Sequence, residues 1–241
     1  MKFFIKIQIF SICVLFSANC QRGPAFKRMP DTFRDAILTG NLEVVRSFMP
    51  LINSSTVLMD AAINTAAIYE ENGVVNVLLQ GGANANATDS KDGGKTPLHH
   101  AAETGNIELI QLLVKNGADI NRPALTGGLT PLMSAVTSNS IDSVRVLLDY
   151  GTNINKTDHF GNTALSYSIG FNNAEMVMLL IGRNARVDDK RDLYYAASVA
   201  NVSQRIIVAL LKKGADINSH DQIGRTPLYY AVRYKDVDLT T

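Results

Sequence analysis

The sequence predicts an all-α repeat solenoid, and three internal regularities carry this prediction. A Thr-Pro-Leu triplet at residue 96 recurs 34 residues later at residue 130, and it returns as Thr-Ala-Leu at 163 and Thr-Pro-Leu at 226. A second pattern, Asn-Gly-Ala-Asp-Ile-Asn at residue 116, has close copies that begin at residues 81, 150 and 213. Between the two patterns lie an Ala-rich segment and a Leu-Leu segment, which predict two short helices in each period.

The first pattern has the chemistry of a helix start, and the second has that of a helix end. A threonine hydroxyl accepts an N–H one turn into the helix, and a proline at the first helical position has its φ already set. A glycine, or at second best an asparagine such as Asn184, takes the left-handed conformation that ends a helix. The residues predicted to shape these corners are Thr96, Pro97, Thr130, Pro131, Thr226 and Pro227 at the starts, and Gly117, Gly151 and Gly214 at the ends.

Residues 94–121, GKTPLHHAAETGNIELIQLLVKNGADIN, resemble the ankyrin repeat, in which a β-hairpin finger is followed by two antiparallel helices. The resemblance covers roughly residues 31–241. It implies units near residues 31–55, 56–94, 95–127, 128–160, 161–188 and 189–223, with a partial last unit at 224–241. It also implies that the hydroxyl of Thr96 and the ring of His99 hydrogen-bond and stiffen their corner, because both residues match the family's positions.

Two units depart from the pattern. In the second unit the distance from Ala62 to Leu78 is about six residues longer than in the third unit, which predicts an insertion around residues 64–69. In the last unit a second helix would begin only at Val237. We therefore expect either a truncated cap there or a partner that covers the apolar face left open.

The first nineteen residues are typical of a secretory signal peptide. Lys2 and Lys6 precede an apolar run over residues 7–16, and the small residues Ser17 and Ala18 follow it. The run is too short to span a membrane as a helix. Residues 1–19 are therefore predicted to be removed on export.

Cys20 stands directly after this segment and resembles the acylated cysteine of a bacterial lipoprotein box. Phe16 and Asn19 depart from the box, where leucine and a small residue are typical. The prediction is a lipidated Cys20, a tether over residues 20–30 and a protein anchored on the periplasmic or surface side of a bacterial cell envelope. Ordinary secretion and an uncleaved leader are the alternatives.

The sequence does not predict a catalytic, cofactor or metal site. A phosphate loop ending in Gly94-Lys95-Thr96 would need a glycine at position 89, which is Asp89. The neighbours His99 and His100 cannot easily face one ion, because adjacent helical residues point about 100° apart. The chain has 23 basic and 22 acidic residues, so it has no basic excess for nucleic acid. Neither a small-molecule substrate nor a nucleic-acid partner is expected.

The ankyrin resemblance implies a protein partner, which would bind along the concave face formed by the fingers and first helices. The residues two and six positions after the helix-start leucine share one face of each first helix. This stripe turns from polar to aromatic towards the last units, where tyrosine rings favour binding. For Tyr167, Tyr195 and Tyr230, packing against a neighbouring helix or finger is an equal alternative. The candidate protein-binding residues are His100, Thr104, Ser134, Tyr167, Phe171, Tyr195, Tyr230 and Tyr234.

The sequence thus predicts a non-enzymatic scaffold that is exported, lipid-anchored and bound to an unidentified protein. The alternative is a secreted effector that acts on host proteins. An enzyme with an unrecognised site is disfavoured, because no nucleophile and base are placed together.

Overall fold

A computed structural model describes residues 29–88 and 92–234 of the chain, and these residues form thirteen helices and no strand. They divide into two compact units. The first holds α3 to α6 and α8, the second holds α9 to α15, and α7 is divided between them after Ala101. The predicted leader, Cys20, the tether up to residue 28 and Val237 lie outside the described residues. Within the described ranges no helix is long and apolar enough to cross a membrane.

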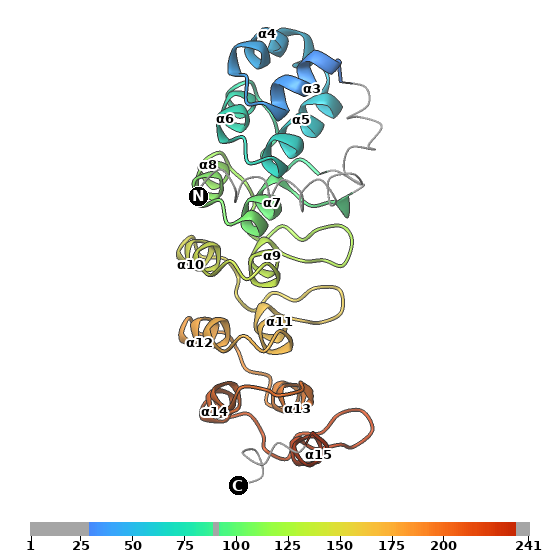
Figure 1. The fold of residues 1–241 in the computed structure, drawn as a ribbon, viewed down its shortest axis with the longest axis vertical. Coiled ribbons are helices and arrows are strands. Elements are labelled where there is room, and N and C mark those ends of the chain that lie inside the picture. Colours follow the sequence, from blue (N-terminus) through green and yellow to red (C-terminus); the bar gives the residue numbers. More distant parts are fainter. Residues whose placement is uncertain (1–28, 89–91, 235–241) are drawn as a thin grey trace. The chain divides into compact units, whose positions relative to one another are not determined.

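The first compact unit is built from helix pairs, in which α3 packs on α4 and α5 packs on α6 (Figure 1). The apolar residues that the repeat pattern places on facing sides form its core, and Phe33, Ile37, Ile63, Leu78 and Leu109 are fully buried. The helices are α3 (Asp31–Leu38), α4 (Leu42–Ile52), α5 (Thr56–Ile68), α6 (Asn72–Gln80), α7 (Pro97–Thr104) and α8 (Ile107–Lys115).

Helix α5 absorbs the predicted insertion. It has 13 residues, whereas α7 has 8. The extra residues include the polar pair Asn64 and Thr65, both buried, whose side chains donate to the carbonyls of Asp60 and Ala61 at 2.9 and 2.7 Å. The insertion thus extends a helix and does not form a loop.

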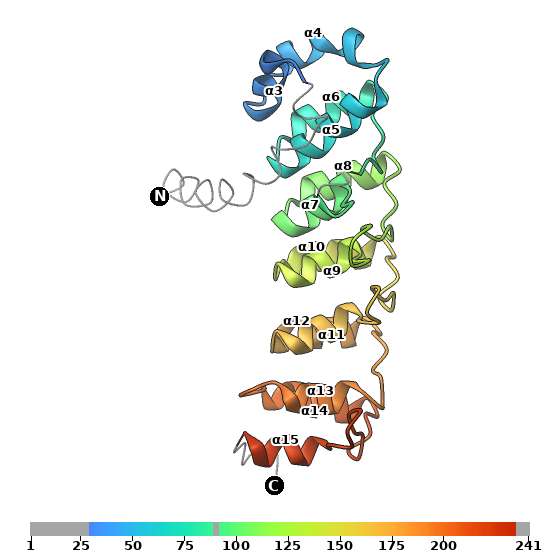
Figure 2. The same cartoon turned by 90° about the vertical axis from the view of Figure 1, so that its right-hand side faces the viewer.

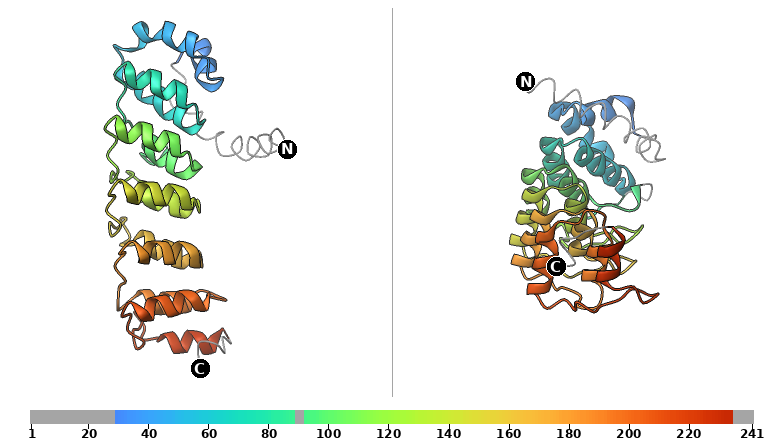
Figure 3. Two further views of the ribbon diagram at one scale, coloured as in Figure 1. Left: turned by 90° about the vertical axis from the view of Figure 1, so that its left-hand side faces the viewer. Right: turned by 60° about the horizontal axis from the view of Figure 1, so that its bottom comes forward.

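The second compact unit contains a first helix packed on a second helix three times, followed by one further first helix. The pairs α9 with α10, α11 with α12 and α13 with α14 pack together, and α15 packs on α13. The first helices form one row and the second helices another (Figure 1), and the loops that connect the pairs run along one edge (Figures 2 and 3). The helices are α9 (Pro131–Thr137), α10 (Ile141–Asp149), α11 (Ala164–Gly170), α12 (Ala174–Gly182), α13 (Asp192–Ser198), α14 (Gln204–Lys212) and α15 (Pro227–Arg233).

Threonine side chains cap the starts of three first helices in this unit. The hydroxyls of Thr130, Thr163 and Thr226 accept the backbone N–H three residues on, at 3.3, 3.2 and 3.4 Å. Pro131 and Pro227 occupy the first turn, where no N–H is needed. At α7 the arrangement differs, because Nδ1 of His99 accepts the N–H of Thr96 at 3.0 Å and lies 2.8 Å from its hydroxyl.

The helix ends and the joints between periods also repeat. Gly117, Gly151 and Gly214 have φ values of +83°, +80° and +91°, and Asn184 takes the same left-handed region at +68°. The side chain of Asn86 donates to Gly117 O at 2.9 Å and accepts Asp119 N–H at 2.7 Å, so it joins one period to the next.

The fingers are closed by turns and single bonds, although the family resemblance implies β-hairpins. Thr126 N–H donates to Gly93 O at 2.8 Å, and His159 N–H donates to Gly127 O at 2.9 Å. These two bonds each tie a finger to the preceding one, and the described residues form no strand there.

Candidate functional site

The predicted binding residues differ in exposure. His100, Ser134 and Tyr230 are buried, Tyr167 is half-buried, and Thr104 is exposed. Nε2 of His100 lies 3.1 Å from a carboxylate oxygen of the finger residue Asp92. His100 and Ser134 therefore present no side chain to a partner in this structure, and the available surface is smaller than the helical periodicity suggested.

Tyr167 fastens α11 to its own finger. Its hydroxyl donates to Asp158 Oδ2 at 2.6 Å, and the same carboxylate accepts the N–H groups of Phe160 and Asn162 at 2.8 Å each. Burial raises the pKa of Asp158, but these hydrogen bonds outweigh burial and hold it below its ordinary value. Burial and the adjacent carboxylate raise the pKa of Tyr167 to about 12, so its hydroxyl remains a donor at neutral pH.

Tyr230 makes the same bond in the last described unit. Its hydroxyl donates to Asp221 Oδ2 at 2.8 Å, and Asp221 also accepts the N–H groups of Ile223 and Arg225. Nε of Arg225 donates to Asp221 at 2.6 Å, and its guanidinium lies 5.0 Å from the centre of the Tyr230 ring. Against the opposing effect of burial, these bonds hold the pKa of Asp221 well below its usual range.

We call each tyrosine–aspartate bond a finger lock. The locks were not predicted from the sequence, although both pairs have the same nine-residue spacing, from Asp158 to Tyr167 and from Asp221 to Tyr230. That repeated spacing could have identified them. For Tyr167 and Tyr230, the lock corresponds to the alternative that the side chain packs against a finger.

Three aromatic side chains remain well exposed on consecutive first helices, and we call them the aromatic face. Phe171 follows α11 and is 59% exposed, Tyr195 lies in α13 and is 37% exposed, and Tyr234 follows α15 and is 42% exposed. Helix α13 packs against both α11 and α15. The hydroxyl of Tyr195 lies beside Gly170, so close that a Cβ there would approach it to 2.5 Å. The ring thus rests against α11.

The aromatic face offers apolar area with hydroxyl groups, which suits non-covalent recognition. Over residues 29–88 and 92–234, no group of three or more His, Cys, Asp or Glu side chains is placed to hold a metal ion.

Comparison with known proteins gives one consistent result. A family model described as ankyrin repeats in three copies matches residues 63–158 and 153–221. An ankyrin repeat protein of fowlpox virus is 34% identical over 160 residues, which are 66% of this chain and 18% of the relative. Human inversin is 29% identical over 167 residues, which are 65% of this chain and 16% of inversin. The chain therefore spans less than a fifth of the length of either relative.

The fold is shared with solved structures. The ankyrin repeat domain of Bcl-3, a member of the IκB protein family, superposes with a TM-score of 0.73 at 25% identity. The match covers 87% of this chain and 97% of that domain.

Proposed function

Because the chain belongs to the ankyrin repeat family, we propose that it is a non-enzymatic scaffold that binds a protein partner through the aromatic face. The observation that carries this proposal is the exposure of Phe171, Tyr195 and Tyr234 on three consecutive first helices. Large aromatic side chains left in water on adjacent elements are typical of interaction surfaces, since their burial by a partner is favourable.

The finger locks support the proposal because they fix side chains and fingers next to the aromatic face before a partner binds. Tyr167 and Tyr230 lie one turn before Phe171 and Tyr234, and their hydroxyls are already bonded to the fingers. A surface whose neighbours are fixed before binding loses less conformational entropy on binding. The locks therefore act as positioning elements, while the exposed rings supply the contact area.

The proposal extends to location. The leader over residues 1–19 and Cys20 support export and lipid anchoring on the envelope of a bacterial cell, on its periplasmic or surface side. Two or three acyl chains would hold such a protein firmly at the membrane. A secreted effector that acts on host proteins is the alternative, and a mature chain without acyl mass in the culture medium would favour it.

The binding proposal is tested by cross-linking in intact cells. We expect the triple variant Phe171→Ala, Tyr195→Ala and Tyr234→Ala to lose a partner that the native chain captures, because truncating a hot-spot ring costs about 2 kcal/mol or more of binding free energy. Tyr150→Ala is the matched control, because Tyr150 is 46% exposed but follows the second helix α10. Circular dichroism checks that all variants fold equally. Equal capture by the triple variant would contradict the aromatic face as the binding surface.

A further inference from the structure

Helix α15 exposes a face that the equivalent helices bury. Leu228 and Val232 are 57% and 63% exposed. The three earlier repeats of the second compact unit carry a leucine at the position of Leu228, and these leucines are at most 1% exposed. At the position of Val232 they carry apolar residues that are at most 3% exposed. These residues are Leu132, Leu165 and Leu193, and Val136, Ile169 and Ala197.

Among the described residues, α9, α11 and α13 have neighbouring helices that α15 does not have. Each of α9, α11 and α13 packs against a second helix of its own period, namely α10, α12 and α14, and also against the first helix of the next period. The part of the chain that the structure describes contains no second helix after α15. The apolar face of α15 thus has the side chains of a helix–helix interface, and no helix within residues 92–234 completes that interface.

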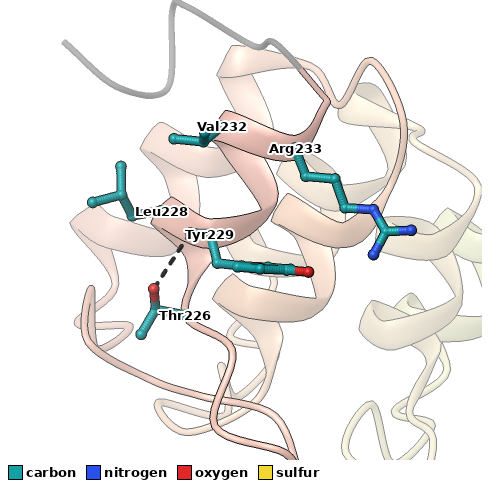
Figure 4. A pocket seen from close by; sticks show the side chains of 5 residues that line it. All are labelled: Thr226, Leu228, Tyr229, Val232 and Arg233. Carbon is teal, nitrogen blue, oxygen red and sulfur yellow. Dashed lines mark hydrogen bonds between the residues drawn. The ribbon is translucent and has the colours of Figure 1, made fainter.

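This face forms a shallow groove of about 390 Å³. Leu228 and Val232 lie one turn apart on one wall, and Tyr229 and Arg233 lie one turn apart on the other (Figure 4). Thr226 lies at the start of the helix, where its hydroxyl accepts Tyr229 N–H. The groove therefore has an aliphatic wall and a wall that ends in a cation.

The charge at one end of the groove indicates the chemistry of the occupant. Arg233 is a basic residue in the last turn of α15, whereas α9, α11 and α13 have none there. It is exposed and has no ion-pair partner among the described residues. The second helices α10 and α12 carry an acidic residue in the first turn, Asp142 and Glu175. A helix antiparallel to α15 would place such an acid beside Arg233.

We propose that the groove on α15 binds an amphipathic helix of a partner protein, antiparallel to α15, with aliphatic side chains one turn apart and an acidic first turn. A second copy of the chain fits this chemistry less well. In the second compact unit, α14 exposes Val208 and Leu211 and α15 exposes its own groove, but neither helix has an acidic residue in its first turn. The proposed site shares no residue with the aromatic face.

The test uses the full chain and a labelled peptide of residues 140–150, SIDSVRVLLDY, with an acetylated N-terminus. This peptide contains α10 and the capping residue on each side; Val144 and Leu147 of α10 are buried, and its first turn contains Asp142. Fluorescence anisotropy is expected to show saturable binding. The binding should be weak, because an isolated helix of this length is only marginally stable.

Two variants locate the peptide. We expect Val232→Glu to abolish binding, and Arg233→Glu to weaken it about fivefold. The matched control is Ile223→Glu, since Ile223 is 73% exposed but lies in the finger, and it should bind as the native chain does. A peptide with Asp142→Lys should bind the native chain more weakly and recover affinity for the Arg233→Glu variant. This charge swap separates direct pairing from a general loss of structure.

Several outcomes would overturn the proposal. One is the absence of saturable binding, and another is binding that Val232→Glu leaves intact. A dimer in sedimentation experiments that Val232→Glu dissociates would assign the groove to a second copy. Peptide binding that appears only after Val237→Asp would assign it to the chain's own last residues.

Discussion

Asp158 and Asp221 each combine two kinds of hydrogen bond, one set from the backbone of their own finger and one from a tyrosine on the following helix. The bond to tyrosine fixes the turn of the finger against the helix that follows it. Because the acceptor is charged, each bond is stronger than one between neutral groups. At the scale of the residue, the carboxylates of Asp158 and Asp221 hold these two fingers to the helices that follow them.

Replacing Tyr167 by phenylalanine removes only the hydroxyl of this lock. We expect the free energy of unfolding to fall by about 1 kcal/mol at pH 7, with an unchanged urea m-value. The folded pKa of Asp158 is lowered, so the lock's contribution is present above the unfolded pKa of about 4 and is lost as pH falls through the folded pKa. The deficit of Tyr167→Phe should shrink over that range. Tyr150→Phe, at an exposed site, is the control and should unfold as the native chain does.

Asp192 has the opposite electrostatic character. It begins α13, is 1% exposed and accepts the N–H of Asp188 at 2.9 Å. Burial raises its pKa, and this effect outweighs the backbone hydrogen bond and the guanidinium of Arg191, whose Nε is 3.7 Å away. The ionised form is therefore penalised in the folded state.

We expect Asp192→Asn to melt at a higher temperature than the native chain at pH 7. A folded pKa above the unfolded value of about 4 means that stability is full below that value and is lost as pH rises through the folded pKa. Asparagine keeps an oxygen for Asp188 N–H and does not ionise, so its advantage should disappear near pH 4. Melting curves by circular dichroism at both pH values measure this. A variant that is less stable at pH 7 would mean that pairing with Arg191 dominates.

At the scale of the element, the ends of the second helices depend on one backbone conformation. Gly117, Gly151 and Gly214 supply it after α8, α10 and α14, and Asn184 supplies it after α12. An added Cβ at any of the three glycines would meet no atom within 4 Å. The preference for glycine there is thus conformational and does not come from crowding.

Substitutions at Asn184 test this point. We expect Asn184→Gly to raise the free energy of unfolding by a few tenths of a kcal/mol, and Asn184→Ala to lower it by about 1 kcal/mol, because a Cβ is costly in the left-handed region. Urea denaturation measures both. Equal stability of the two variants would show that the side chain of Asn184, and not its backbone, ends α12.

The repeated helix pairs could be predicted from sequence because their starts and ends depend on local chemistry, as at Thr130 and Gly151. The burial of individual side chains could not be predicted in this way. Helical periodicity assigned His100, Tyr230 and Phe171 to the equivalent exposed face of their helices. His100 and Tyr230 are instead buried, in contact with finger carboxylates. The insertion near Asn64 was predicted, but the sequence did not indicate that the extra residues lengthen α5 to 13 residues.

At the scale of the whole molecule, the proposed location depends on Cys20, a residue outside the repeats. We expect the native chain to carry acyl mass and to partition into detergent with the membrane fraction, and Cys20→Ala to lose both properties. Cys13→Ala is the matched control, because Cys13 lies within the segment predicted to be removed. Mass spectrometry and phase partitioning measure the outcome. Unchanged mass and fractionation of Cys20→Ala would exclude the lipid anchor.

The joint at Asn86 limits how the protein can be produced. Asn86-Ala87-Thr88 is an acceptor sequence for N-linked glycosylation in a eukaryotic secretory pathway. The sugar would be attached to Nδ2, the atom that donates to Gly117 O. A bulky glycan there would compete with the contact between neighbouring periods. Protein secreted from eukaryotic cells would therefore be a mixture of intact and weakened joints, whereas bacterial expression would leave every copy of this asparagine free to bond.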